Sequence, residues 1–201
     1  MARQSVARHL VVRPWRVRAG MTAAAVMAAL LVAQPSRAEV SLLAPPGLLA
    51  AATSGDVEKI RTMVAHTKRP DVNDGYGNTP LIIVIKSGNA EAVKVLLEAG
   101  AHPGAADNEG NSALIWAAEG GDTGIVRQLL KKNARVDQEN RQGLTALMAA
   151  ARKGNADVVD VLIKIGAEVA KVDYTGRDAL AWAKDSRNPR VAEVLRRSGA
   201  H

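Results

Sequence analysis

A sequence pattern returns every 33 residues along most of this chain. Three positions keep one residue type at each return: Gly77, Gly110, Gly143 and Gly176; Leu81, Leu114, Leu147 and Leu180; and Leu96, Leu129, Leu162 and Leu195. A fixed period of this length is typical of a repeat array, in which each unit is one small supersecondary element. Such a unit buries its apolar face by stacking on its neighbours. The period therefore indicates an array of stacked repeats.

Each unit opens with a related motif, which reads Thr79-Pro80-Leu81, Ser112-Ala113-Leu114, Thr145-Ala146-Leu147 and Asp178-Ala179-Leu180. Together with the period, this motif resembles the Thr-Pro-Leu-His-x-Ala signature of the ankyrin repeat, a β-turn finger followed by two antiparallel helices. The His of that signature, which normally ties the finger to the first helix, is absent from all four motifs. The resemblance runs from about residue 44 to residue 201. It implies an all-α ankyrin solenoid of helix-turn-helix units with β-turn fingers.

We expect about five repeats, including the caps, in the ranges 44–76, 77–109, 110–142, 143–175 and 176–201, after a lead-in at 39–43. The first repeat lacks the Thr-Pro-Leu opening, as terminal repeats often do. In the last repeat, Lys184 and Arg196 occupy positions that are apolar in every interior repeat. A terminal repeat has no following neighbour, so its outer face must be polar. We therefore expect residues 176–201 to form a C-terminal cap.

Residues 1–38 have the pattern of a secretory signal peptide. Six Arg and no acidic residue lie in this range, an apolar stretch runs from Ala19 to Ala33, and Ser36-Arg37-Ala38 ends it with small residues where a signal peptidase reads them. We expect cleavage before Glu39 and a periplasmic or secreted product with no membrane attachment. Two alternatives stay open. A mitochondrial transit peptide is also rich in Arg, and an uncleaved anchor would need roughly 20 apolar residues.

The composition excludes several kinds of site. The chain has no Cys, which excludes disulfides, thiol nucleophiles and Cys-based metal sites. Its net charge of +7 belongs to the leader, because residues 39–201 hold 21 basic and 20 acidic residues. This nearly neutral body lacks the electrostatic footprint of a nucleic-acid-binding protein. We therefore predict no nucleic-acid partner.

We also predict no catalytic residue, no cofactor and no metal ion. Nothing in the sequence brings a Ser, a His and an Asp together as a nucleophilic triad would require. The recurring residues Asp74, Asp107, Asn140 and Asp173 start the fingers, where Asp and Asn bond their own backbone and set the turn. They lie one repeat apart, which is too far to share a cation whose ligands lie at roughly 2.3–2.6 Å.

Positions that vary at a fixed register are the candidate binding residues, because packing does not dictate them. The family resemblance places such positions on the concave face, at the finger tips and on the first helices. The set is Tyr76, Asn78, Lys86, Asn108, Glu109, Asn111, Trp116, Glu119, Arg141, Gln142, Leu144, Arg152, Tyr174 and Arg177. Tyr76, Arg141, Tyr174 and Arg177 are the preferred hot spots, since Tyr and Arg are enriched among residues that dominate interface energetics. The alternative is that these residues are ordinary solvated tips.

Two tryptophans at one repeat position have two interpretations. Trp116 and Trp182 lie two repeats apart and are equivalent to Ile83 and Ala149. They could be aromatic anchors for a partner, or half-buried residues that pack between helices, as is common at this position in the family. The second interpretation is the one that we favour.

The expected function is non-catalytic binding of another protein, of unknown identity, by a monomer in an exported compartment. A preformed surface loses little conformational entropy when a partner docks. Protection of an exported enzyme and neutralisation of a toxin, as an immunity or inhibitor protein, are both open as roles. The competing hypothesis is an enzyme whose site is grafted on the repeat array.

Overall fold

The computed structural model describes residues 46–66, 70–186 and 188–200, which belong to one compact unit, 41–201. The expected signal peptide and the lead-in lie outside the described residues. The helices in the described ranges are α2 (Pro46–Ser54), α3 (Val57–His66), α4 (Pro80–Lys86), α5 (Ala90–Glu98), α6 (Ala113–Gly120), α7 (Thr123–Lys131), α8 (Ala146–Lys153), α9 (Ala156–Lys164), α10 (Ala179–Asp185) and α11 (Pro189–Arg197).

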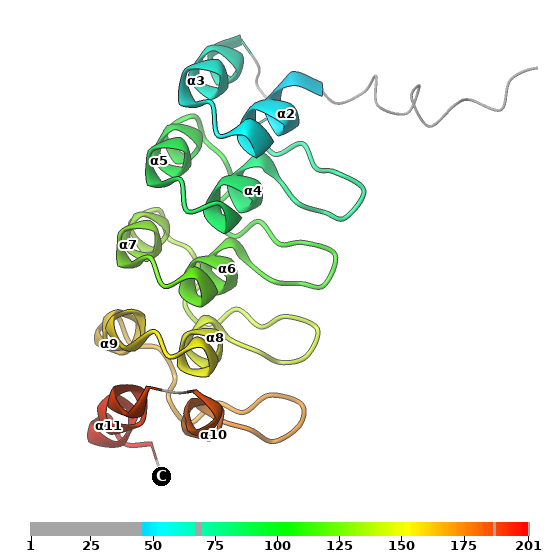
Figure 1. Cartoon of the computed structure of the whole chain (residues 1–201). Coiled ribbons are helices and arrows are strands. Elements are labelled where there is room, and N and C mark those ends of the chain that lie inside the picture. The colour runs from blue at the N-terminus through cyan, green and yellow to red at the C-terminus, as the bar shows by residue number, and fades with distance from the viewer. Residues whose placement is uncertain (1–45, 67–69, 187, 201) are drawn as a thin grey trace, which may run out of the picture. The chain divides into compact units, whose positions relative to one another are not determined.

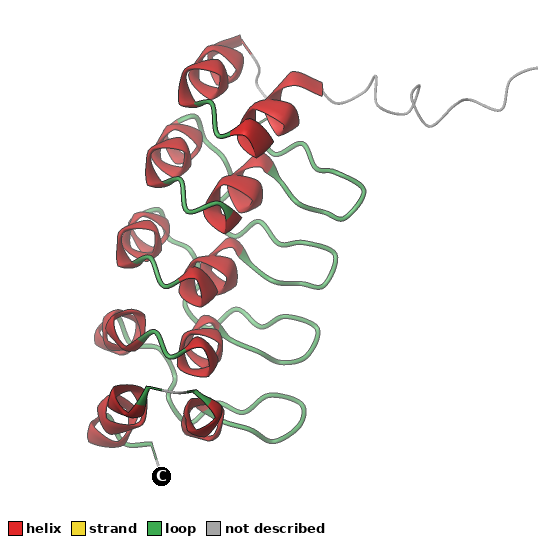
Figure 2. Cartoon of the chain, in the orientation of Figure 1, coloured by secondary structure: helices red, strands yellow, loops and turns green. Residues whose placement is uncertain are grey.

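The helices form five antiparallel pairs that stack in two layers (Figure 1). The first helices α2, α4, α6, α8 and α10 pack in one layer, and the second helices α3, α5, α7, α9 and α11 pack in the other. Long loops extend beside the first-helix layer (Figure 2). Within the described ranges, extended segments pair only as isolated antiparallel bridges, Ala106 with Ser112 and Val172 with Asp178. The expected all-α array of helix pairs with turn-like fingers is confirmed.

Each first helix after α2 begins at a capping residue of the repeated motif. The side-chain oxygens of Thr79, Ser112, Thr145 and Asp178 accept hydrogen bonds from the amide three residues on, at 3.3, 3.2, 3.4 and 2.7 Å. An N-cap of this kind satisfies one of the four orphan amides at a helix start. The second helix ends at a left-handed residue, which is Gly100, Asn133 or Gly166 in the interior repeats. Asn133 is thus the tolerated substitute for Gly.

The core lies between the two layers and is made of small aliphatic side chains. Leu81, Leu96, Leu129 and Leu162, which belong to the recurring set, are fully buried. Where the family signature has His, Ile82, Ile115 and Met148 are buried instead. The two positions that turn cationic in the last repeat, Lys184 and Arg196, are exposed. The outer side of the last repeat is therefore polar, as expected for a cap.

Backbone hydrogen bonds join each finger to the next. The amides of Asn108, Arg141 and Tyr174 donate to the carbonyls of Tyr76, Glu109 and Gln142 at 3.1, 3.1 and 3.0 Å. These bonds recur at the 33-residue period and hold the tips in a fixed spacing. The finger tips are therefore a continuous, ordered surface and not independent loops.

Candidate functional site

The candidate site is the finger face, which we define as the finger loops 74–79, 107–112, 140–145 and 173–178 together with the first helices α4, α6, α8 and α10. Most of the residues singled out from the sequence lie here. Their surroundings differ from repeat to repeat, so each group of contacts is described separately.

The second and third repeats form a depression of about 250 Å³ on this face. Its lining residues are Tyr76, Asn78, Lys86, Asp107, Asn108, Glu109 and Trp116. Six of these residues are among the candidate binding residues, so the fold brings them together from positions up to 40 residues apart in the sequence. Tyr76 is 77% exposed and forms an open wall. The depression therefore combines an aromatic side chain that water can reach with both signs of charge.

Lys86 and Trp116 form the centre of this depression. The Lys86 ammonium lies 3.9 Å from the centroid of the Trp116 ring and donates a 2.6 Å hydrogen bond to Asn78 Oδ1. The indole Nε1 of Trp116 donates to Asp107 Oδ2 at 3.0 Å. A cation held over an indole face is attracted by the ring quadrupole. Lys86 is thus ordered by its own chain before any partner arrives.

The same arrangement recurs two repeats later around Trp182. Its indole Nε1 donates to Asp173 Oδ2 at 3.0 Å, and the guanidinium of Arg177 lies 3.8 Å from the ring centroid. Arg177 also pairs with Asp185, and Arg152 lies 5.4 Å from the same ring. Trp116 and Trp182 are half-buried and pack against the core. Their packing agrees with the favoured interpretation, and each also orders a cation of the finger face.

Ion pairs and a second depression link the middle of the face. Glu119 pairs with Arg152 at 3.4 Å and with Lys153 at 2.9 Å. Arg141 and Gln142 line a depression of about 280 Å³ with Glu109 and Asn140. These contacts each join neighbouring repeats. Polar groups of the finger face are therefore organised across repeats rather than within single fingers.

The structure contradicts the expected exposure of two candidate binding residues, Leu144 and Asn111. Leu144 is only 3% exposed because its side chain packs in the core, and Asn111 is only 8% exposed. The Asn111 amide group donates to Asp107 at 3.3 Å, and its Oδ1 accepts from Asn140 Nδ2 at 2.7 Å. Both side chains are therefore structural, and neither can offer itself to a partner. The sequence variation at these positions reflects alternative ways of packing.

Reasoning from the sequence missed the acidic partners of the two tryptophans. Asp107 and Asp173 set their turns as expected, but each also accepts an indole hydrogen bond. The signal was present in the repeat register: Asp107 precedes Trp116 by nine residues and Asp173 precedes Trp182 by nine residues. Both tryptophans therefore have an acidic residue at this spacing, although the equivalent Asp74 precedes Ile83 and has no indole partner.

The pKa of Asp173 shows how strongly this carboxylate is held. Burial raises its pKa, but hydrogen bonds from the Thr175 hydroxyl, the amides of Arg177 and Thr175 and the Trp182 indole outweigh burial and leave the pKa below its ordinary value of 3.8. A carboxyl whose pKa is lower in the folded state stabilises the fold above its ordinary pKa. This contribution is lost as the pH falls through the lower folded pKa.

We expect Asp173→Asn to lower the free energy of unfolding by about 1–3 kcal/mol at pH 7, because the new amide group cannot accept the Trp182 indole hydrogen bond as the carboxylate does. The difference from the wild type should shrink as the pH falls below about 3.8, where Asp173 of the unfolded chain takes up a proton, and it should be lost below the lower folded pKa. Urea unfolding at pH 7 and pH 3 measures both effects. Asp160→Asn, which removes only the surface ion pair of Asp160 with Lys164 on α9, is the control and should change stability by less than about 0.5 kcal/mol. A loss for Asp173→Asn that is the same at both pH values would contradict the role of the charge.

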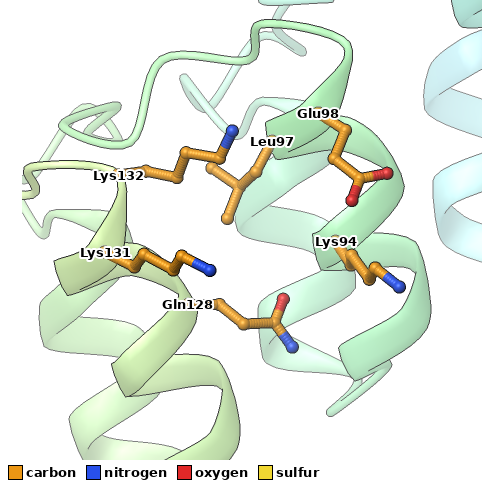
Figure 3. Close-up of a pocket in the computed structure, with 6 residues that line it drawn as sticks. All are labelled: Lys94, Leu97, Glu98, Gln128, Lys131 and Lys132. Atoms are coloured by element: carbon orange, nitrogen blue, oxygen red, sulfur yellow. The ribbon is translucent and has the colours of Figure 1, made fainter.

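Two further depressions of the described residues lie away from the finger face. One lies between α5 and α7 and is lined by Lys94, Leu97, Glu98, Gln128, Lys131 and Lys132 (Figure 3). Among the residues that the structure describes, no group of His, Cys, Asp and Glu is arranged to hold a metal ion. In the same part of the chain, no helix has the length and apolar character of a membrane span.

The fold and the finger face define a helical repeat array with an ordered surface of mixed charge. Comparison with protein families gives the particular one: the model described as "Ankyrin repeats (3 copies)" matches residues 48–140 and 125–201. The chain therefore belongs to the ankyrin repeat family, whose repeats are generally protein-protein interaction modules and typically non-catalytic. The comparison with curated proteins gave no match.

Proposed function

We propose that this protein is a non-catalytic module that binds one partner protein through its finger face after export to the periplasm. The observation that supports this function best is the depression around Lys86 and Trp116, which two finger loops and the helices α4 and α6 form together. Exposed aromatic residues next to ordered charges are the composition of interface hot spots.

The order of the finger face supports binding without folding. The inter-finger backbone bonds fix the tips, and internal contacts hold Lys86 and Arg177 over indole rings. A partner that docks on this face therefore pays little side-chain ordering cost. Tyr76 and Tyr174, at 77% and 72% exposure, are the large side chains with most surface to lose. They are the first residues to test.

The test is crosslinking and capture from the exported fraction with the wild type and with Tyr76→Ala/Arg141→Ala/Tyr174→Ala. Arg177 is left intact because it also holds Trp182 and Asp185. We expect one protein to be captured by the wild type, and its affinity to fall at least about tenfold in the variant, since hot-spot truncations cost more than about 1 kcal/mol each. The affinity is then measured by calorimetry with the purified partner.

The control is Lys59→Ala/Arg127→Ala/Ile165→Ala, which changes three exposed residues of the second-helix layer and its loops. Circular dichroism must show that both triple variants are folded. Equal affinity of wild type and finger-tip variant would reject the finger face as the binding surface. Absence of the protein from the exported fraction would reject the proposed location.

A further inference from the structure

The loops that connect neighbouring repeats are tied by an aspartate at two of three equivalent places. Asp71 Oδ1 accepts a hydrogen bond from the amide of His102 at 2.9 Å, and Asp137 Oδ1 accepts one from the amide of Glu168 at 3.0 Å. The position between them, one period from each, is Gly104. The amide that a side chain at residue 104 would reach belongs to Arg135. In the described part of the chain, this amide donates no hydrogen bond.

A depression of about 480 Å³ lies where the missing side chain would be. Its lining residues are His102, Pro103, Gly104, Lys132, Asn133, Arg135 and Gln138. The side chains of Lys132 and Arg135 are exposed, and within the described ranges neither is part of an ion pair with a carboxylate. No acidic residue lines this depression. It is therefore a cationic pocket with an unused backbone donor.

The neighbouring depression strengthens the positive charge. It shares Lys132 with the first and adds Lys94 and Lys131, against the single carboxylate of Glu98. Figure 3 shows Lys131, the last residue of α7, and Lys132, which follows it, on the side of α7 that faces α5. Three lysines around adjoining depressions raise the local concentration of anions. None of these residues belongs to the finger face.

We propose that the pocket at Gly104 binds a carboxylate, which takes the place of the aspartate that the other two loops carry. One carboxylate oxygen accepts the hydrogen bond of the Arg135 amide, as Asp71 and Asp137 do for the equivalent amides. The side chains of Lys132 and Arg135 neutralise its charge. Hydrogen bonds to an ionised acceptor are about twice as strong as neutral ones. The carboxylate comes either from a free dicarboxylic acid or from an acidic side chain of a bound protein.

Two variants of the chain separate this proposal from general attraction of anions. Gly104→Asp supplies the missing carboxylate from the chain itself. Gly104 is not in the left-handed region, and an added Cβ would meet His102 Cε1 at 3.0 Å, so the imidazole, whose Nδ1 accepts from the Gly104 amide at 3.2 Å, must shift slightly. Asp137→Gly empties the equivalent place one repeat later, where Ile165 and Glu168 stand instead of Lys132 and Arg135. It opens a similar space without counterparts of Lys132 and Arg135, and the nearby Lys171 is already paired with Glu139 and Glu168.

The experiment follows the backbone amides of the full chain by nuclear magnetic resonance. The probes are succinate and an acetylated, amidated Gly-Asp-Gly peptide, each at constant ionic strength. In the wild type we expect a saturable shift of the Arg135 amide with at least one probe. The amide of Glu168, one repeat away, is the internal reference, because it already donates to Asp137. Gly104→Asp should weaken binding at least about tenfold, because its own carboxylate occupies the donor.

Each outcome decides the proposal. Tighter binding of succinate identifies a free dicarboxylate as the ligand class, and tighter binding of the peptide identifies a protein-borne carboxylate. No response of Arg135 to either probe overturns the site. An unchanged response in Gly104→Asp, or a new site of equal affinity in Asp137→Gly, also overturns it by showing attraction without the specific donor and cations. The proposal is independent of the finger face, whose test uses capture of a partner.

Discussion

Replacing Leu162 with Ala is expected to lower the free energy of unfolding by about 2–5 kcal/mol, because truncating a buried Leu removes its transfer free energy and leaves a cavity. Leu162 is fully buried in α9. This helix packs against its partner α8 and against α7 and α11 of the adjoining repeats. In a repeat array the stability is close to a sum of repeat and neighbour terms. The cavity therefore weakens one repeat and both of its interfaces.

Ile165→Ala is the matched control for this prediction. Ile165 follows α9 directly and is 56% exposed. Its truncation leaves no cavity, so the free energy of unfolding should change by less than about 0.5 kcal/mol. Urea titrations followed by circular dichroism give both values. Unfolding of the two variants at the same urea concentration would contradict the burial of Leu162 between the two helix layers.

The second large effect is expected for Gly77→Ala, at the tip of the first described finger. Gly77 has a φ of +80°, and a Cβ added there would lie 2.7 Å from the backbone nitrogen of Asn108. That nitrogen donates the inter-finger bond to Tyr76. The variant therefore combines the left-handed strain of about 1–2 kcal/mol with displacement of a neighbouring backbone. We expect a total loss of about 2–4 kcal/mol, including the broken hydrogen bond.

Gly176→Ala isolates the strain from the contact. Gly176 holds the same place in the last finger with a φ of +79°, and an added Cβ would meet no atom within 4 Å. It should therefore cost only the strain, about 1–2 kcal/mol. The difference between the two variants measures the coupling between fingers. Equal losses would show that the fingers are energetically independent. They would contradict a finger face that is held rigid by bonds between fingers.

The repeat period, the residues that cap the helices and the core positions could all be predicted from the sequence. Each depends on contacts between residues close in the chain or on a residue type that recurs at a fixed spacing. The capping bond of Ser112 spans three residues, and the left-handed φ of Asn133 is a property of one residue. Signals of this kind depend only on residues close together in the chain, so they can be recognised from the sequence alone. The same reasoning identified the finger residues as a group.

The contacts within that group could not be predicted, because they cross from one repeat to another. Lys86 lies over Trp116 although 30 residues separate them, and Arg152 of the fourth repeat lies beside Trp182 of the fifth. The same variation that suggested binding placed Leu144 in the core. The depression at Gly104 could not be predicted either, because it depends on how the loop around Arg135 lies against the loop around Gly104. Side-chain direction and the spacing between stacked repeats decide such contacts, and both are set by packing in three dimensions.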